Sequence, residues 1–189
     1  MTRLKVGVDK LLGGTGSDQL WGGDATDLPY GGAGNDTIFG DQDDGAPPGQ
    51  DFIDGGFGND VIIGGPKADQ MSGGAGADTF KYVRAASATD GLNEAPVGHA
   101  DFIRDFSRAE GAYIDQRSMD ANPLIGGNQA FDVVESSSTQ AGTAWFGTVS
   151  DNKVQSVFFN VDGGTGADMQ IMVQLTGGMT SLSESDFFL

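Results

Sequence analysis

The chain lacks cysteine and contains a single histidine, His99, so the usual ligands for zinc and copper are almost absent. Those metals are bound mainly by cysteine sulfur and histidine nitrogen. A zinc protease with an HExxH motif needs two histidines and is therefore excluded. Because His99 has no partner histidine or cysteine, we expect it to be a surface or cap residue and not a metal ligand or general base.

The motifs of other hydrolases are missing as well. The sequence has no Gly-x-Ser-x-Gly, and a catalytic triad would depend on His99 alone. A pair of carboxylates for glycoside chemistry is always available among 27 acidic residues, so such a pair lends no support to that activity. We therefore expect that the chain is not an enzyme, although it can be the non-catalytic fragment of a larger secreted enzyme.

Basic residues are scarce. Ten lysines and arginines stand against 27 acidic residues, which gives a net charge of −17 and disfavours nucleic acid and anionic membranes as partners. Residues 1–10 contain no apolar run, so we expect no cleavable signal peptide, and no stretch is long enough to cross a membrane. The absence of cysteine is consistent with an exported protein that avoids thiol chemistry.

Glycine, by contrast, is abundant, and residues 13–81 repeat with a period of nine. Each copy has two glycines, a variable residue, usually a third glycine, a variable residue, aspartate, and three residues whose middle one is usually apolar. The uninterrupted copies are GGTGSDQLW, GGDATDLPY, GGAGNDTIF, GGFGNDVII, GGPKADQMS and GGAGADTFK. A fourth copy is interrupted by DDGAPP at residues 43–48, and a degenerate copy with Gly7, Asp9 and Leu11 in phase precedes the others. A fixed period of this kind is the signature of a repeat architecture.

The period predicts a coil in which turns and short strands alternate. Glycine supplies the positive-φ turns, and the residue in the middle of each strand points into the core. The predicted inward residues are Leu11, Leu20, Pro29, Ile38, Ile53, Ile62, Met71 and Phe80. Two repeats form one coil, so every second aspartate shares an edge. One edge is predicted to carry Asp18, Asp36, Asp60 and Asp78, and the other Asp9, Asp27, Asp51 and Asp69.

Stacked carboxylates need a counter-ion. Paired strands lie about 4.8 Å apart, and two carboxylates at that spacing repel each other. Calcium takes six to eight oxygens from carboxylates and carbonyls, which is the supply that these turns offer. The predicted ligands, through side chain or carbonyl, are Asp9, Gly14, Gly16, Asp18, Gly23, Asp27, Gly32, Gly34, Asn35, Asp36, Gly49, Asp51, Gly56, Gly58, Asn59, Asp60, Gly65, Asp69, Gly74, Gly76 and Asp78. We expect about six Ca²⁺ ions, which account for most of the acidity.

Each coil buries only two apolar side chains, which is little against the entropy of ordering so many glycines. Metal-binding free energy then becomes folding free energy, so we predict that the coil is disordered without calcium. The alternative is a flexible linker rich in glycine and aspartate. A linker has no reason to keep aspartate at one phase in seven copies, which favours metal binding.

GGTGSDQLW, GGAGNDTIF and GGAGADTFK resemble the calcium-binding nonapeptide repeats of RTX proteins. The resemblance implies an all-β fold, a right-handed parallel β-roll with calcium held between successive turns. Two copies, GGDATDLPY and GGPKADQMS, lack the third glycine, and Pro29 occupies an inward strand position. We therefore expect weaker or missing sites around Asp27, Asp51 and Asp69.

The period ends at residue 81, which divides the chain into a predicted roll at 1–81 and a β-rich cap at 82–189. Residues 82–98 are predicted to form a loop. The apolar residues predicted to cover the open end of the roll are Phe102, Ile103, Phe106, Tyr113 and Ile114. The segment resembles the one that follows the last repeat in serralysin-type secreted proteases. That resemblance implies Asp101 and Asp105 as further calcium ligands, with Asp115 as a weaker match and Ala112 where the family usually has aspartate.

The last third is predicted to be β-structure, with strands at 130–134, 144–149, 154–161 and 169–175. The loop at 162–168 resembles a repeat turn, so Asp162 and Asp168 are alternative metal ligands, but its flanking strands favour a hairpin.

The chain ends in Asp186-Phe187-Phe188-Leu189, which resembles the C-terminal export signal of type I secretion substrates; the alternative is a final edge strand. We interpret the chain as a secreted, extracellular, non-catalytic calcium-binding module that folds after export through the type I secretion machinery. It is then the C-terminal part of a secreted exoprotein, or kin to one. The alternative is a calcium-dependent adhesion or polysaccharide-binding protein.

Overall fold

The structure, a computed structural model, describes residues 2–3, 7–41, 47–83, 100–119, 130–161, 163 and 167–188. Almost all of its regular structure is β-strand, with two short 3₁₀ helices, Arg108–Glu110 and Glu184–Asp186. Within these residues, no helix has the length and apolar character needed to cross a membrane.

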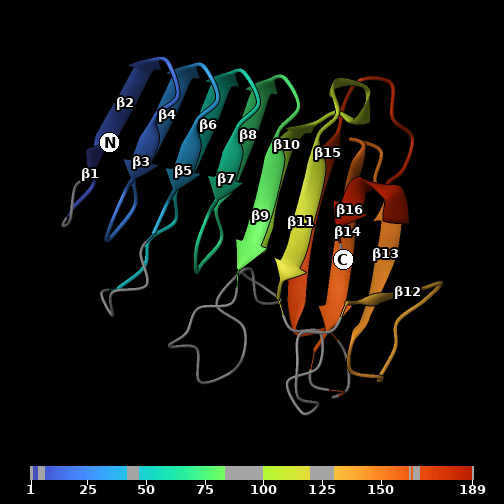
Figure 1. The fold of residues 1–189 in the computed structure, drawn as a ribbon. Helices are drawn as coiled ribbons and strands as arrows, with labels where there is room; N and C mark the ends of the chain where they lie inside the picture. Colours follow the sequence, from blue (N-terminus) through green and yellow to red (C-terminus); the bar gives the residue numbers. More distant parts are fainter. Residues whose placement is uncertain are drawn as a thin grey trace.

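Residues 7–83 wind between two parallel sheets (Figure 1). The strands of one sheet have six residues each, and those of the other are mostly three residues long. The longer strands are β2 (Lys10–Thr15), β4 (Leu28–Ala33), β6 (Phe52–Phe57) and β8 (Gln70–Ala75). The shorter strands are β3 (Gln19–Trp21), β5 (Thr37–Phe39), β7 (Val61–Ile63) and β9 (Thr79–Val83), and β1 (Thr2–Arg3) pairs with β3 at the start. The predicted parallel β-roll is confirmed.

The register of the strands shows how the nine-residue period becomes a coil. Lys10 pairs with Leu28, so one coil takes 18 residues, as predicted. Tyr30 pairs with Asp54, so the coil that contains the insertion takes 24 residues and returns to the same register. The insertion therefore does not change the order of the side chains within the sheets.

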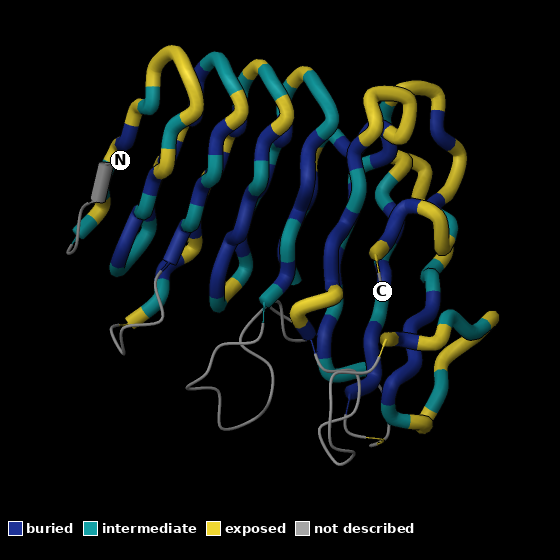
Figure 2. The backbone as a smooth tube through the Cα atoms, viewed as in Figure 1, coloured by how far each residue is buried: buried dark blue, intermediate teal, exposed yellow. Residues whose placement is uncertain are grey.

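The core lies between the two sheets, and the exposed residues collect at the turns and on the outward faces (Figure 2). The eight residues predicted to point inward, including Pro29, are all buried. This pattern arises because side chains along a strand alternate between the core and the outward face.

The chain continues both sheets beyond the repeats. Strand β10 (Asp101–Phe106) pairs with β8, and β11 (Tyr113–Ser118) pairs with β9. Ile103, Phe106 and Ile114 are buried in the same core as the repeats, as predicted for the residues that cover the open end. The predicted boundary at 81/82 thus falls inside β9 and between parts that share both sheets; the division into a roll and a cap stays a prediction.

The last third adds an antiparallel meander to the sheet that contains β2, β4, β6 and β8, which we call the longer sheet. The sheet that contains β3, β5, β7 and β9 is the shorter sheet. Strands β13 (Thr143–Val149), β14 (Val154–Asn160) and β15 (Met169–Leu175) pair in order, and β15 joins β10 in parallel. Strand β12 (Asp132–Val134) lies at one edge of that sheet, and β16 (Phe187–Phe188) pairs with β11 at the edge of the other. The predicted strands are present and β14 and β15 form the predicted hairpin. Asp162 and most of the predicted loop at 82–98, with His99, lie outside the described residues.

Candidate calcium sites

One edge of the roll carries the first predicted column of carboxylates, at the turns that follow β2, β4, β6 and β8. The backbone N–H of each aspartate donates to Oδ1 of the aspartate one coil further on. The distances are 2.7 Å from Asp18 to Asp36, 2.8 Å from Asp36 to Asp60, and 3.0 Å from Asp60 to Asp78. Each carboxylate thus bridges two coils through one of its two oxygens. We call this column the first ladder.

The other edge carries a second ladder, at the turns that follow the shorter strands. Here the N–H groups of Asp9, Asp27 and Asp51 donate to the carboxylates of Asp27, Asp51 and Asp69 at 2.7–2.8 Å. Asp69 N–H donates in the same way to Asp101 Oδ1 at 2.8 Å, so Asp101 extends the second ladder by one coil. The predicted assignment of aspartates to two edges matches this geometry.

The other oxygen of these carboxylates is buried and has no hydrogen-bond donor within the described part of the chain. This holds for Oδ2 of Asp18, Asp27, Asp36, Asp51, Asp60 and Asp69. Buried carboxylate oxygens without a donor are costly, and they are rare in folded proteins. A cation, which accepts electron pairs, is the kind of group that would satisfy these oxygens in successive turns.

The first glycine of each repeat shows where these oxygens point. An added Cβ at Gly31 would lie 2.5 Å from Asp36 Oδ2 and 2.5 Å from the Gly55 carbonyl oxygen of the next coil. The equivalent point at Gly55 lies 2.4 Å from Asp60 Oδ2 and 2.6 Å from the Gly73 carbonyl oxygen. Carboxylate and carbonyl oxygens from adjacent coils therefore meet beside the same glycine, and this is the donor set that calcium prefers.

Burial disfavours the ionised form of these carboxylates when no cation is present, and therefore raises their pKa values. Burial raises the pKa of Asp69 to about 10, of Asp51 to about 7 and of Asp60 to about 6, against the hydrogen bond that each accepts from a backbone N–H. The same cause raises the pKa of Asp101 to about 7, while the Asp69 N–H and the Tyr82 hydroxyl oppose the rise. The pKa values of Asp27 and Asp78 are also raised, and burial is the largest cause.

The predicted ligand glycines form the turns. Nearly all of them have positive φ: Gly14, Gly16, Gly23, Gly32, Gly34, Gly56, Gly58, Gly65, Gly74 and Gly76. In the two copies without a third glycine, Ala25 (φ 72°) and Lys67 (φ 96°) take the left-handed conformation in its place. Non-glycine residues reach that region at a cost of roughly 1–2 kcal/mol. These two turns therefore have the same backbone conformation as the other copies, with local strain at Ala25 and Lys67.

The two predicted asparagines use their side chains elsewhere. Asn35 Oδ1 accepts the Asn59 N–H at 2.9 Å, and Asn59 Oδ1 accepts the Ala77 N–H at 2.9 Å. Both residues are exposed and form an outer column of hydrogen bonds parallel to the first ladder. Their amide oxygens are therefore engaged between coils, which leaves the backbone carbonyl as the group that each can offer to a metal.

Asp105 stands apart from both ladders. Its carboxylate accepts the Gly73 N–H and the Gly74 N–H, each at 2.9 Å, and the Ser72 hydroxyl. It thus caps the glycine turn of β8. The first ladder ends at Asp78, because Ala112 occupies the next position: Tyr113 N–H donates to the Asp78 carbonyl, as Val61 N–H does to Asp36. Asp115 is paired with Arg117 at 2.8 Å, which lowers its pKa.

One buried carboxylate was missed by sequence reasoning. Asp41 occupies the second-glycine position of the interrupted copy and is 7% exposed. Its Oδ2 is also without a hydrogen-bond donor in the described residues. The signal in the sequence is the replacement of a repeat glycine by an acidic residue next to the insertion.

No group of three or more carboxylate, histidine or cysteine side chains is close enough to hold a metal by itself among the described residues. Sites in these turns must therefore combine carboxylate oxygens with backbone carbonyls, as the oxygens beside Gly31 do.

The family model of the RTX calcium-binding nonapeptide repeat (4 copies) matches residues 6–38, 13–45 and 48–80. The roll therefore consists of RTX repeats, which bind calcium. Two solution structures are similar to the chain: the AlgE6R3 and AlgE6R2 subunits from the Azotobacter vinelandii mannuronan C5-epimerase. They have 21% and 18% identity and TM-scores of 0.46 and 0.48; the alignments cover 93% and 94% of this chain and 80% and 90% of theirs. No curated protein matches the chain in sequence.

Proposed function

We propose that this chain, whose roll consists of RTX calcium-binding repeats, is a non-catalytic module of a secreted protein that folds when it binds calcium. The observation that carries the proposal is the pair of ladders, in which each buried Oδ2 lies beside a turn of backbone carbonyls. The ligands are the ladder aspartates, from Asp9 to Asp101, together with carbonyls of the glycine turns. Calcium supplies the positive charge that lets these carboxylates stay ionised inside the fold.

The proposed place of folding is outside the cell. Calcium sites of extracellular modules have dissociation constants of roughly 10⁻⁴–10⁻³ M, so the scarce calcium of the cytoplasm leaves them unfilled. A chain with a net charge of −17 then stays open and can pass through a narrow export channel. Calcium outside the cell closes the roll, which prevents the chain from slipping back.

The C-terminal segment supports this order of events. In the folded chain the Arg108 guanidinium binds the buried carboxylate of Asp186 through two nitrogens, and Phe187 is buried. Strand β16 pairs with β11. A segment bound in this way is accessible to an export machinery only before the cap folds, so export must precede folding.

Deleting residues 186–189 is expected to abolish secretion by a type I system, because it removes the proposed signal. The Arg108→Ala variant is the control, since it removes the ion pair to Asp186 but keeps the signal, and it should be secreted as the parent chain is. The measurement is the amount of protein in the medium. Undiminished secretion of the deleted chain contradicts the export proposal, and so does equal loss in both variants.

Polysaccharide binding is the second candidate, and one observation favours it. On the outward face of the longer sheet, Tyr30 and Phe52 are 38% and 45% exposed. A shallow hollow beside Phe52 is also lined by Asp54, Gln70, Ser72 and Arg104, and the Arg104 guanidinium donates to Gln70 Oε1 at 2.9 Å. Exposed rings with polar groups at their rims suit sugar rings. A glycan array probed in calcium with the parent chain and with Phe52→Ala tests it, and an array without any bound glycan rejects it.

A further inference from the structure

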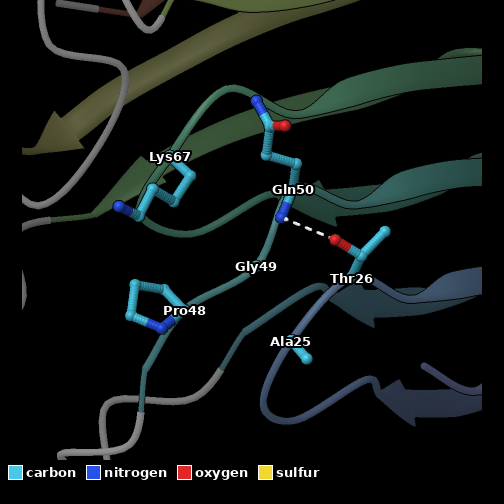
Figure 3. Close-up of a pocket in the computed structure, with 6 residues that line it drawn as sticks. All are labelled: Ala25, Thr26, Pro48, Gly49, Gln50 and Lys67. Carbon is cyan, nitrogen blue, oxygen red and sulfur yellow. Dashed lines mark hydrogen bonds between the residues drawn. The ribbon is translucent and has the colours of Figure 1, made fainter. Parts of the chain in front are cut away.

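The turn of the interrupted repeat is built differently from the others. In the other copies the second and fourth positions have positive φ, whereas here they are Asp41 and Gly49, and neither does. Instead, Gly49 N–H donates to Asp41 Oδ1 at 3.1 Å, which joins the two sides of the insertion. Figure 3 shows the returning end, where Pro48 and Gly49 lie beside Ala25 and Thr26 of the previous coil. At this turn, the hydrogen bond to the Asp41 side chain thus takes the place of the two positive-φ residues of the other copies.

Oδ2 of Asp41 lies 3.1 Å from the point where a Cβ of Gly65 would be, next to the Gly64 carbonyl that accepts the Asp41 N–H at 3.1 Å. The charged groups that act on its carboxyl are Asp51, then Asp27 and Asp24, and the opposing contribution comes from the Gly49 N–H. Asp51 belongs to the second ladder, is fully buried, and likewise has an Oδ2 without a donor in the described residues. That Oδ2 and the Gly64 carbonyl oxygen each lie 2.3 Å from the point where a Cβ of Gly40 would be.

Burial of a second carboxylate beside Asp51 is unfavourable unless one of the two holds a proton or both bind the same cation. Two such charges repel each other strongly in a poorly solvated site. A hydrogen bond to Gly49 requires only an acceptor, and a neutral asparagine supplies one at lower cost. The acceptor role therefore explains Oδ1 of Asp41 but leaves its charge and its buried Oδ2 unexplained.

We propose that Asp41 and Asp51 bind a divalent cation of the calcium type at the base of the insertion, with the Gly64 carbonyl as a third oxygen. This ion joins Asp41 to Asp51 on the two sides of the insertion and fixes the 24-residue coil in register with its 18-residue neighbours. The proposal rests on the calcium-binding function above, but it assigns a ligand that the repeat pattern does not contain. An added carboxylate strengthens a calcium site, so this site fills before the others. The proposal therefore departs from the weak site that the repeat pattern alone predicts around Asp51.

The test is a calorimetric calcium titration of the full chain. Asp41→Asn keeps the acceptor for Gly49 N–H and removes the charge, so the tightest site should weaken by about tenfold or more, or be lost. Asp132→Asn, which makes the same charge change at an exposed position on β12, should titrate as the parent chain does. An unchanged tightest site in Asp41→Asn overturns the proposal.

A second variant separates ligand loss from misfolding. Asp41→Glu keeps the carboxylate on a longer side chain, so it should retain a larger part of the tight binding than Asp41→Asn. Equal losses in the two variants assign the effect to packing and overturn the proposal. If the parent chain itself binds no calcium, the proposed function fails; if the parent binds and Asp41→Asn binds equally well, only the present inference fails.

Discussion

Chelation of calcium is expected to unfold the roll, with loss of most of the strand signal in far-ultraviolet circular dichroism. The reason is the charge buried at its two edges: without a cation, the carboxylates of Asp51, Asp60 and Asp69 are ionised at neutral pH only at a high cost. The few apolar side chains of each coil do not offset that cost. Adding calcium back should restore the signal.

Trp21 allows the same transition to be followed at one place. Its ring stacks on Phe39 in the next coil, with centroids 5.4 Å apart, and the chain has two tryptophans. A Trp145→Phe variant leaves Trp21 as the single reporter, and its fluorescence should change together with the strand signal. Magnesium is the control, because it demands near-octahedral geometry and keeps its water, so it should not refold the chain. A strand signal that survives chelation contradicts the proposal.

Acidification of the metal-free chain is expected to have the opposite effect and to restore strand structure. The sign follows from the raised pKa values: a carboxyl that holds its proton more tightly in the fold stabilises the fold when it is protonated. That stabilisation is complete below pH 3.8, the ordinary pKa of an aspartate side chain. It is lost as the pH rises through the pKa values in the fold, which are about 6 for Asp60, about 7 for Asp51 and about 10 for Asp69.

The metal-free chain should therefore have more strand at about pH 4 than at about pH 7.5, as measured by circular dichroism in chelator. With calcium present, protons compete for the same oxygens, so the affinity of the sites for calcium, measured by calorimetry, should fall as the pH falls. The salt-bridged Asp115 has the reverse sign, because its pKa is lowered, but it lies outside the ladders. A metal-free chain that loses strand on acidification over this range contradicts the assignment of the buried carboxylates.

Much of the fold followed from the period alone. Because side chains alternate along a strand and the repeat has nine residues, residues such as Leu20, Ile38 and Ile62 had to share one face, and all three are buried. The same arithmetic placed Asp18, Asp36 and Asp60 on one edge, where their hydrogen bonds now connect successive coils. Local chemistry was sufficient here, since each coil touches only its neighbours.

Where the period is broken, the sequence was less informative. The register of 24 residues across the insertion and the role of Asp41 depend on contacts between residues far apart in the chain. Asp101 and Asp105 looked equivalent by resemblance, yet one continues the second ladder and the other caps the Gly73 turn. The difference of a few residues in strand position decides which donors a carboxylate meets.

The sequence by itself determined the coil, its two acidic edges and the class of ion they suit, because a strict period leaves each repeat one way to stack on the next. Only the tertiary structure decided that ladder aspartates such as Asp36 and Asp60 accept a backbone N–H through one oxygen and leave the other buried beside a carbonyl. It also decided that the C-terminal strand β16 pairs with β11 at the edge of the shorter sheet, and that Arg108 forms an ion pair with Asp186. Those outcomes depend on which coils and strands become neighbours, and neighbours that are distant in the chain are set by packing.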